Sequence, residues 1–305
     1  MQVAHRSIRV DLAYRIARRL IAARQARQGV NNAEAVDWQA YYDWRYRTLK
    51  AEFNENFSTE AIIGKDIIDF GCGDGSLSIV LMDAGAKSVH GVDLDERGLE
   101  KFAERLKRYA GTRQPTFSHS SSGKKIDLPD HSFDCIVCFD VMEHVMDYRD
   151  IIFEWHRVLR PGGKVYIWWQ PYWHPFGHHA HDWVPIPWAH IFLNDDEFRQ
   201  VCARIVDWPD FQPSAWDRNP DGSRKNRFRL PDSGNFLNKL TVREFERVCS
   251  DAGFELARRQ FHPFSMPQPL KAISALGTKL PGARDFFSAC AIYDLVASSP
   301  RTTDH

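Results

Sequence analysis

The sequence predicts an α/β protein built on a doubly wound, mostly parallel β-sheet. Through residues 64–171, short apolar runs alternate with amphipathic helical patterns, as is typical of repeated β-α units. The first apolar run ends in a turn containing Gly71, Gly73 and Gly75, and the second ends in an acid, Asp93. Open sheets of this kind bind ligands at the carboxyl ends of their strands, where both features fall.

The elements of this sheet can be assigned in order along the chain. Apolar runs predict core strands at 65–70, 88–94, 115–120, 133–141 and 164–171. Helices are expected from about residue 77, at 95–110 and at 146–159, and the sequence PGG then ends the last of them. Further along, a helix at 194–206, a helix running from Thr241 to Gly253, and strands at 254–261 and 286–298 complete the pattern.

The overall composition excludes several classes of protein. Lys+Arg and Asp+Glu are both 40, so the chain lacks the basic excess of a general nucleic-acid binder. No run of 18 apolar residues predicts a membrane span. Cys135 and Cys138 form a CxxC, but positions three apart on a strand point to opposite faces, which argues against a zinc or redox pair. The scattered cysteines suit a reducing cytoplasm.

The first 30 residues are rich in arginine and have helical periodicity. The basic residues of this stretch are Arg6, Arg9, Arg15, Arg18, Arg19, Arg24 and Arg27. The only acid among them is Asp11, and Val10, Leu12, Ile16 and Leu20 recur at helical spacing. One interpretation is a targeting peptide or a peripheral contact of residues 1–29 with an anionic membrane. The other, which we favour, is a solvated helix packed on the domain by one apolar stripe.

The glycine turn carries acids that discriminate between ligands. Its spacing is Gly71-x-Gly73-x-Gly75 rather than G-x-G-x-x-G. Asp69 and Asp74 would repel the pyrophosphate of a dinucleotide, and they suit a ligand with cationic groups such as an ammonium beside a sulfonium. Asp93, 22 residues after Gly71, can accept both hydroxyls of a ribose.

Four segments in this order resemble the motif series of class I S-adenosylmethionine-dependent methyltransferases. They are IIDFGCGDG at 67–75, VHGVDL at 89–94, LPDHSFDCIVCFDVMEHV at 128–145 and VLRPGGKVYI at 158–167. The resemblance covers about half of the chain when the segment at 240–256 is included. It implies a Rossmann-like methyltransferase fold with seven strands, the last antiparallel, and S-adenosylmethionine as the cofactor.

The resemblance also implies roles for individual residues. The methionine part of the cofactor would be lined by Asp69, Gly71, Gly73 and Gly75. Asp93 would hold the ribose, Leu94 would touch the adenine, Asp140 would lie near the methionine end and the substrate, and Arg45 would reach the methionine carboxylate. Two alternatives stay open: Gly75 only allows close helix packing, and Asp140 only caps a helix. Residues 118–122, SHSSS, depart from the family, which often places an acid there to meet the adenine amine.

These features divide the chain into four expected parts. They are an N-terminal helical extension and cofactor cap (1–63), the S-adenosylmethionine-binding core (64–171), a substrate-binding insert or lid (172–238) and a C-terminal completion of the sheet (239–305). The insert is expected because its long irregular stretch, rich in aromatic residues, interrupts two regular units.

Histidines follow the fifth expected strand, at the rim where acceptors dock in this family. They are His174, His178, His179, His181 and His190. Methyl transfer to a hydroxyl requires loss of the hydroxyl proton, and histidine is the natural base near neutral pH. A block of similar sequence in uncharacterised members of the family favours His179, and then His190, with His144 as a further candidate.

A metal site is the alternative use of the same region. Asp140, Glu143 and His144 place two carboxylates and an imidazole within about one helical turn, which suits Mg²⁺ or Zn²⁺. Quinone-biosynthesis O-methyltransferases carry a similar motif, and some need a divalent cation. Because the same EH pair is widespread in members that need no metal, we favour a histidine base over a metal.

The sequence therefore predicts S-adenosylmethionine-dependent methylation of a small-molecule acceptor, with a hydroxyl favoured over a nitrogen. The aromatic residues of the insert suit a ring, a sugar or a lipid-linked acceptor. Two hypotheses from other functional classes remain as alternatives. One is a dinucleotide-dependent oxidoreductase on a similar sheet, and the other is a catalytically inactive methyltransferase fold that serves as an interaction module. The sequence gives no oligomeric state.

Overall fold

The computed structural model describes residues 7–28, 38–213, 218, 223–229, 237–264 and 270–298. Parts of two sequence-based assignments therefore lie outside the described residues. In the arginine-rich stretch, residues 1–6, 29 and 30 are outside, which includes Arg6. In the expected insert, the segments 214–217, 219–222 and 230–236 are outside.

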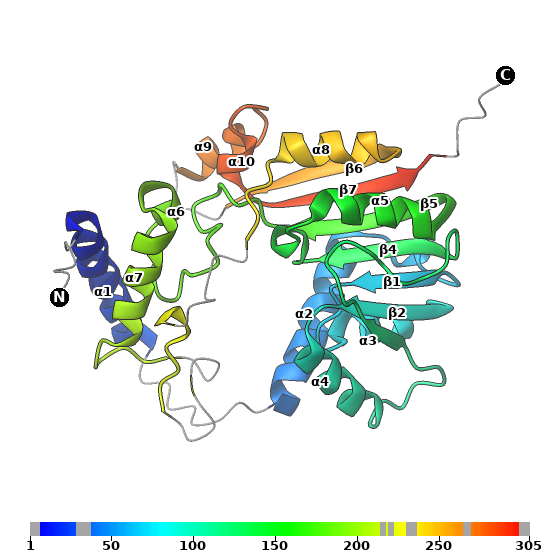
Figure 1. Ribbon diagram of the computed structural model, residues 1–305, viewed down its shortest axis with the longest axis horizontal. Coiled ribbons are helices and arrows are strands. Elements are labelled where there is room, and N and C mark those ends of the chain that lie inside the picture. The colour runs from blue at the N-terminus through cyan, green and yellow to red at the C-terminus, as the bar shows by residue number, and fades with distance from the viewer. Residues whose placement is uncertain are drawn as a thin grey trace.

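Seven strands form one sheet in the order β3-β2-β1-β4-β5-β7-β6 (Figure 1). Their bounds are β1 Asp66–Phe70, β2 Ser88–Asp93, β3 Thr116–His119, β4 Phe133–Phe139, β5 Leu159–Trp169, β6 Phe254–Pro263 and β7 Ser288–Ala297. Neighbouring strands are parallel except that β7 runs antiparallel to both β5 and β6. This confirms the predicted doubly wound, mostly parallel sheet. The strand order reverses between β1 and β4, which places the ligand-binding crevice at their carboxyl ends.

The prediction for the fifth strand was wrong at its start. The sequence PGG was expected to separate helix from strand, but β5 begins at Leu159 and runs through Gly162. Phe133 pairs with Leu159, and the register then shifts so that Cys135 pairs with Lys164. Gly162 has a φ of 76°, a conformation that glycine adopts readily, so the chain can bulge here without leaving the sheet.

Helices cover both faces of the sheet and form separate cores there. On one face, α2 (Trp38–Asn56) and α3 (Ser76–Asp83) bury Phe53 and Leu81. On the other, α5 (Tyr148–Val158) and α8 (Val242–Asp251) bury Trp155 and Phe245. α4 (Glu96–Leu106) packs beside β2 and β3 through Phe102, and α9 (Leu270–Gly277) and α10 (Arg284–Phe287) precede β7.

Two details of the sequence analysis can be checked in these cores. Cys135 belongs to one core and Cys138 to the other, so the CxxC is split between opposite faces of β4, as predicted. The helix expected from Thr241 is present, and the Thr241 hydroxyl caps it by accepting from the Glu244 amide at 3.1 Å. Its end is marked by Gly253, with a φ of 90°.

A second lobe lies beside the sheet and has its own apolar core. It consists of α1 (Ile8–Gln28), α6 (Ala189–Phe192), α7 (Asp195–Val206) and the irregular segment 172–188, at the left of Figure 1. α1 packs on α7 through one stripe, and Asp11 pairs with Arg204 at 2.6 Å. The expected extension 1–63 thus contributes to both parts of the molecule: α1 joins the lobe, whereas α2 covers the sheet.

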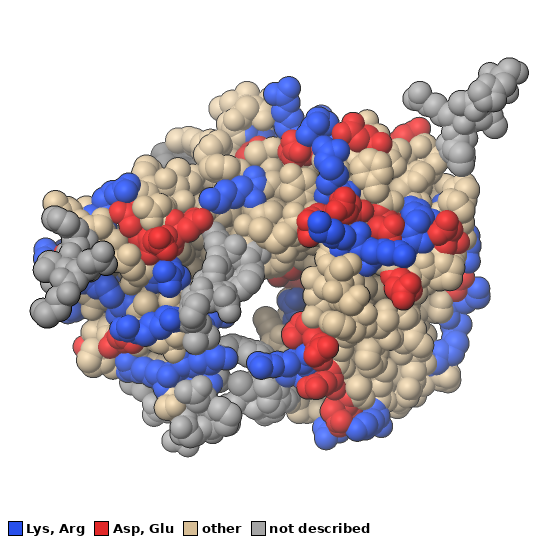
Figure 2. Space-filling view, in the orientation of Figure 1, with Lys and Arg blue, Asp and Glu red and all other residues tan. Residues whose placement is uncertain are grey.

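The charged surface carries both signs, as Figure 2 shows for one face. Within the described ranges, none of the helices combines the length and the apolar content needed to cross a membrane.

Candidate active site

Two adjoining cavities lie at the carboxyl ends of β1, β2 and β4. The larger has a volume of about 730 Å³ and the smaller about 260 Å³. They share four lining residues: Gly71, Asp95, Asp140 and Val141. The two cavities therefore adjoin at the point where the strand order reverses, and together they are called the groove below.

The three glycines of the turn have different structural roles. Each has a positive φ, between 50° and 77°. A Cβ on Gly71 would lie 2.3 Å from Val141, and a Cβ on Gly75 would lie 2.1 Å from the ring of Phe102. A Cβ on Gly73 would have nothing within 4 Å, and Gly73 lines the smaller cavity. Gly73 thus leaves room for a ligand, whereas Gly75 allows α4 to approach closely.

Asp93 joins the glycine turn to the end of the second strand. Its carboxylate accepts the Gly73 amide and the Asp95 amide, each at 2.7 Å. Asp93 also lines the larger cavity, and each carboxylate oxygen keeps a further lone pair. The two backbone bonds fix the carboxylate in place, and the remaining lone pairs suit a pair of ribose hydroxyls.

Asp69 is a buried carboxyl at the base of the smaller cavity. Its only recorded side-chain partner among the described residues is the Ser78 hydroxyl, which donates at 2.6 Å. Burial, more than any neighbouring charge, raises the pKa of Asp69 to about 7. A cation placed in this cavity would favour the ionised form, which fits the ammonium and sulfonium groups of the expected cofactor.

The remaining predicted cofactor residues can now be placed. Arg45 on α2 lines the smaller cavity, Leu94 lines the larger, and Asp140 lines both. Asp140 has a φ of 59° and accepts the Gln170 side-chain amide at 3.1 Å. The groove therefore collects all the predicted cofactor residues except Gly75, and its donors and acceptors fit S-adenosylmethionine.

Several lining residues were missed by the sequence analysis. Met146 and Ile151 contribute an apolar wall to the larger cavity, and Tyr41 and Lys101 line the smaller one. The periodic pattern gave no signal that separates these residues from ordinary core or surface positions. Ser120 and Ser122, from the segment that departs from the family, also line the larger cavity.

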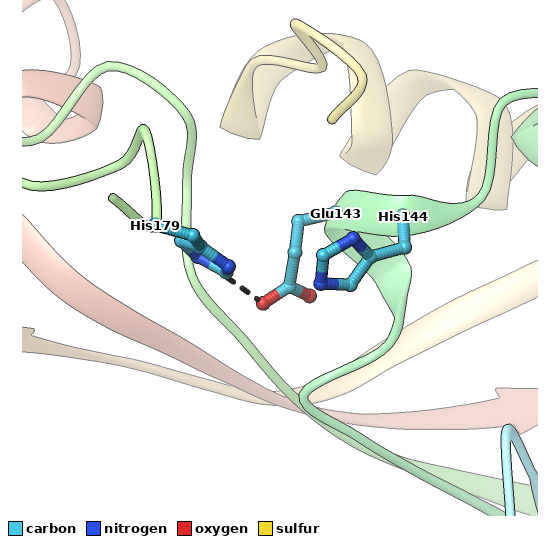
Figure 3. A group of neighbouring side chains, drawn as sticks. All are labelled: Glu143, His144 and His179. Carbon is cyan, nitrogen blue, oxygen red and sulfur yellow. Dashed lines mark ion pairs between the residues drawn. The ribbon is translucent and has the colours of Figure 1, made fainter. Parts of the chain in front are cut away.

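A cluster of Glu143, His144 and His179 lies where the lobe meets the sheet (Figure 3). Glu143 and His144 belong to the short 3-10 helix η2 (Met142–His144) after β4, and His179 comes from the irregular segment of the lobe. One ligand atom from each lies within 4.8 Å of the others. The His179 Nε2 and Glu143 Oε1 atoms are 3.8 Å apart, and the two imidazole centres are 5.3 Å apart.

Burial shifts the pKa values of Glu143 and His179 in this cluster away from their values in water. Neither carboxyl oxygen of Glu143 has a hydrogen-bond partner among the described residues. Burial first, and then the Asp140 charge, raise the pKa of Glu143 well above its usual value. Burial, and then His144, lower the pKa of His179 to about 4. At neutral pH, His179 is therefore neutral, and burial favours the protonated form of Glu143.

The two histidines of the cluster do not face the groove equally. His144 lines the larger cavity together with Asp140. His179 and Glu143 are not among the residues that line either of the two cavities. His144 is thus better placed than His179 to meet a molecule in the groove.

Asn238, at the end of the expected insert, holds the turn that carries the cluster. Its side-chain amide donates to the carbonyls of Met142 and Val145 at 2.7 and 2.8 Å, and its backbone amide donates to the backbone carbonyl of Glu143 at 2.8 Å. This turn is therefore fixed by the segment that leads back into the sheet.

Other histidines of the lobe organise its backbone. His190 Nε2 donates to the Tyr172 carbonyl at 2.8 Å, and burial lowers the pKa of His190 to about 4. His174 Nδ1 and His178 Nδ1 accept backbone amides two residues further on, and burial lowers the pKa of each to about 3. The structure brings His179 and His144 together and leaves His190 in a separate packing contact with His178.

The possible metal ligands also differ from the predicted set. The structure groups Glu143 and His144 with His179, whereas Asp140 is not part of that group. Two imidazoles and one carboxylate form a donor set that suits Zn²⁺ better than Mg²⁺.

Comparisons with known proteins relate the central part of the chain to methyltransferases. Residues 68–167 match the family model described as a methyltransferase domain. Over 119 residues the chain is 36% identical to a ubiquinone biosynthesis O-methyltransferase of Idiomarina loihiensis, which covers 39% of this chain and 47% of that protein. A protein of the same name from Pseudomonas aeruginosa is 31% identical over 106 residues, or 35% of this chain and 44% of that protein.

The chain thus spans less than half the length of these relatives. Among solved structures, an S-adenosylmethionine-dependent methyltransferase from Mesorhizobium loti aligns with 88% of this chain and all of its own, at 18% identity and a TM-score of 0.48.

Proposed function

We propose that this chain, which carries a class I S-adenosylmethionine-dependent methyltransferase domain, methylates a hydroxyl of a small-molecule acceptor. The observation that carries the proposal is the position of His144, on the wall of the cofactor groove and in contact range of Glu143 and His179. The partly matching relatives are named as O-methyltransferases, which supports oxygen as the acceptor atom.

In this proposal the groove holds the cofactor through both of its ends. Bound S-adenosylmethionine supplies an electrophilic methyl group on a sulfonium. Asp93 holds the ribose hydroxyls in the larger cavity, and Arg45 pairs with the methionine carboxylate in the smaller one. Asp69 and Asp140 offset the positive charge of the ammonium and sulfonium, and the open space at Gly73 lets the ligand approach the backbone.

The acceptor hydroxyl must lose its proton as its oxygen attacks the methyl carbon and the carbon–sulfur bond breaks. We assign the proton to His144, because this imidazole lines the groove beside Asp140. Glu143 and His179 act behind it as positioning residues, since they pack against its ring and restrict its orientation. His179, which the sequence favours as the base, has a pKa lowered to about 4 by burial and is therefore a weaker base.

The described part of residues 172–238 serves as the acceptor-side insert in this account. Its two ends contact the turn after β4, through His179 at one end and Asn238 at the other. An acceptor in the groove would therefore meet this segment and the sheet together. All six cysteines are free and buried, which supports a cytoplasmic location.

A bound divalent cation is the second candidate for the same cluster. The unpartnered, fully buried carboxyl of Glu143 favours it, because a cation would satisfy both oxygens at once. Glu143, His144 and His179 would hold it and leave positions open for an acceptor oxygen, whose proton it would make easier to remove.

Transfer of a labelled methyl group tests the proposal. The purified protein is incubated with S-adenosylmethionine labelled in the methyl group and with panels of phenols, catechols and amines. We expect label in a hydroxyl-bearing acceptor, and unchanged activity after dialysis against a chelator. Activity that disappears with the chelator and returns with Zn²⁺ would favour the cation. Label that enters only amines would contradict the assignment of oxygen.

A further inference from the structure

We propose that the outward face of α1 docks the protein on a membrane surface rich in anionic phospholipid. This surface consists of Ile8, Leu12, Ile16 and Leu20 with the arginines among them, and Phe192 of α6 lies at its end. It is independent of the methyl-transfer site.

The apolar residues of α1 are divided in an unusual way. The side that packs on α7 places Val10, Ala13, Ala17 and Ile21 in the core of the lobe. Four further leucine and isoleucine residues are exposed: Ile8 by 84%, Leu12 by 57%, Ile16 by 41% and Leu20 by 44%. Their spacing of four makes each a neighbour of the next along the outward side of the helix. A merely solvated face would carry polar residues at these positions.

The charge of the same face points to an anionic partner. The described helix 8–28 contains six arginines and one acid, Asp11, which is engaged with Arg204. Arg15 and Arg19 are exposed and fall between the aliphatic residues around the helix. Aliphatic side chains on this face can enter the apolar layer of a bilayer, while the long arginine stems beside them reach phosphate groups.

The helix is held so that this face stays outward. Arg9 pairs with Glu197 at 3.0 Å and donates to the Phe192 carbonyl at 3.1 Å, and Arg24 pairs with Asp182 at 3.0 Å. These contacts lie at both ends of the helix and join it to the lobe. Phe192, 67% exposed, is thereby fixed beside the first turn of α1 and extends the apolar surface.

A second copy of the chain is a less suitable occupant. Two such faces brought together would oppose arginine to arginine, which is unfavourable without interleaved acids. An anionic bilayer provides both the negative charge and the apolar layer that this face requires. The arrangement would also keep the lobe at the lipid surface.

Sedimentation with lipid vesicles tests the proposal on the full-length protein. Vesicles of phosphatidylcholine with phosphatidylglycerol should bind the wild type, and vesicles of phosphatidylcholine alone should bind it much more weakly. The double variant Arg15→Gln, Arg19→Gln should lose roughly 25-fold in affinity, since each arginine contributes about fivefold near an anionic surface. The double variant Leu12→Gln, Ile16→Gln should lose about tenfold or more.

A matched control uses exposed apolar residues elsewhere. Ile63 and Phe153 lie on the sheet domain and are exposed by 56% and 44%, close to Leu12 and Ile16. The variant Ile63→Gln, Phe153→Gln should bind vesicles as the wild type does, and circular dichroism should show that all variants are folded. Absence of wild-type binding to the anionic vesicles overturns the proposal. So does equal loss in the control variant, or a dimer that the Leu12→Gln, Ile16→Gln change dissociates without any vesicle binding.

Discussion

The sheet and the lobe beside it satisfy their buried polar groups in different ways. At the end of β1 and β2, Asp69 and Asp93 meet hydroxyl and amide donors within 2.7 Å. In the lobe, His174 and His178 each use one ring nitrogen on the backbone and leave the other buried without a recorded partner in the described chain. These carboxyls of the sheet thus accept from hydroxyl and backbone donors, whereas the lobe uses imidazole nitrogens that must stay unprotonated to accept backbone amides.

The proposed chemistry lies at the boundary of these two regions. Glu143 and His144 are supplied by the sheet and His179 by the lobe, so neither part contains the complete cluster. Substitutions at this boundary should therefore lower the catalytic rate, whereas substitutions within either region should change cofactor affinity or the stability of the fold.

The largest effect is expected for His144→Ala. Removal of a general base lowers turnover by about 10²–10⁴. Affinity for S-adenosylhomocysteine should change little, because the cofactor is held mainly by the glycine turn and Asp93. Turnover measured with labelled S-adenosylmethionine and affinity measured by calorimetry separate the two effects.

His179→Ala provides the comparison for this variant. Because His179 only positions the base, its replacement should lower turnover less than His144→Ala does. The wild-type rate should rise with pH as the base loses its proton. His179→Ala should keep this rise, and His144→Ala should lose it. The assignment of the base moves to His179 if that variant alone loses the pH-dependent limb.

Two glycine variants test whether each glycine is needed for packing of the fold or for space around the ligand. Gly75→Ala should destabilise the fold by about 2–4 kcal/mol, because its Cβ would enter the ring of Phe102 at a positive φ. Gly73→Ala should cost only about 1 kcal/mol of stability, from its positive φ, and should weaken S-adenosylhomocysteine binding. Denaturant titration and calorimetry measure the two quantities, and equal destabilisation by both variants would remove the distinction.

Acid should destabilise the lobe through its buried histidines. The folded pKa of His178 is lowered to about 3 by burial, below its unfolded value, so the unfolded chain binds more protons as pH falls. The stability is therefore fully present above about pH 6.5 and is lost progressively below it. At pH 5, this histidine should lower the free energy of unfolding by at most about 2 kcal/mol.

Replacement of one buried histidine tests this pH dependence. His178→Asn keeps an acceptor for the Ala180 amide and removes the titrating ring, so unfolding monitored by tryptophan fluorescence should depend less on pH between 7 and 5. His181 is 60% exposed in the same segment, and His181→Asn should leave the dependence unchanged. Identical pH profiles for the wild type and His178→Asn would contradict the role given to the buried imidazoles.

Sequence periodicity was informative for the sheet and much less so for the lobe. Alternation of apolar runs located all seven strands, because each strand buries residues at a regular spacing. It misplaced the start of β5, where Gly162 allows a bulge that local turn preferences could not reveal. The motifs also pointed to Asp93 and Gly73, which line the groove.

The cluster could be predicted only in part. Glu143 and His144 are adjacent in the sequence, but His179 reaches them through the folding of an irregular segment with no periodic pattern. The choice among the five histidines of that segment depends on which backbone amides and carbonyls their nitrogens meet, as for His190 and Tyr172. Such contacts are set by tertiary structure and leave no spacing signal.

The most direct test of the central claim is calorimetric titration of the groove with S-adenosylhomocysteine and with NAD. The account predicts that S-adenosylhomocysteine binds in the micromolar range and that NAD does not bind, because the Asp69 carboxyl on the wall of the smaller cavity disfavours a pyrophosphate. Asp74 adds little to this selection, because its carboxylate is paired with Arg105 at 3.2 Å. Asp93→Ala should weaken S-adenosylhomocysteine binding by about 1–3 kcal/mol through the loss of hydrogen bonds to ribose. Binding of NAD without binding of S-adenosylhomocysteine would contradict the account.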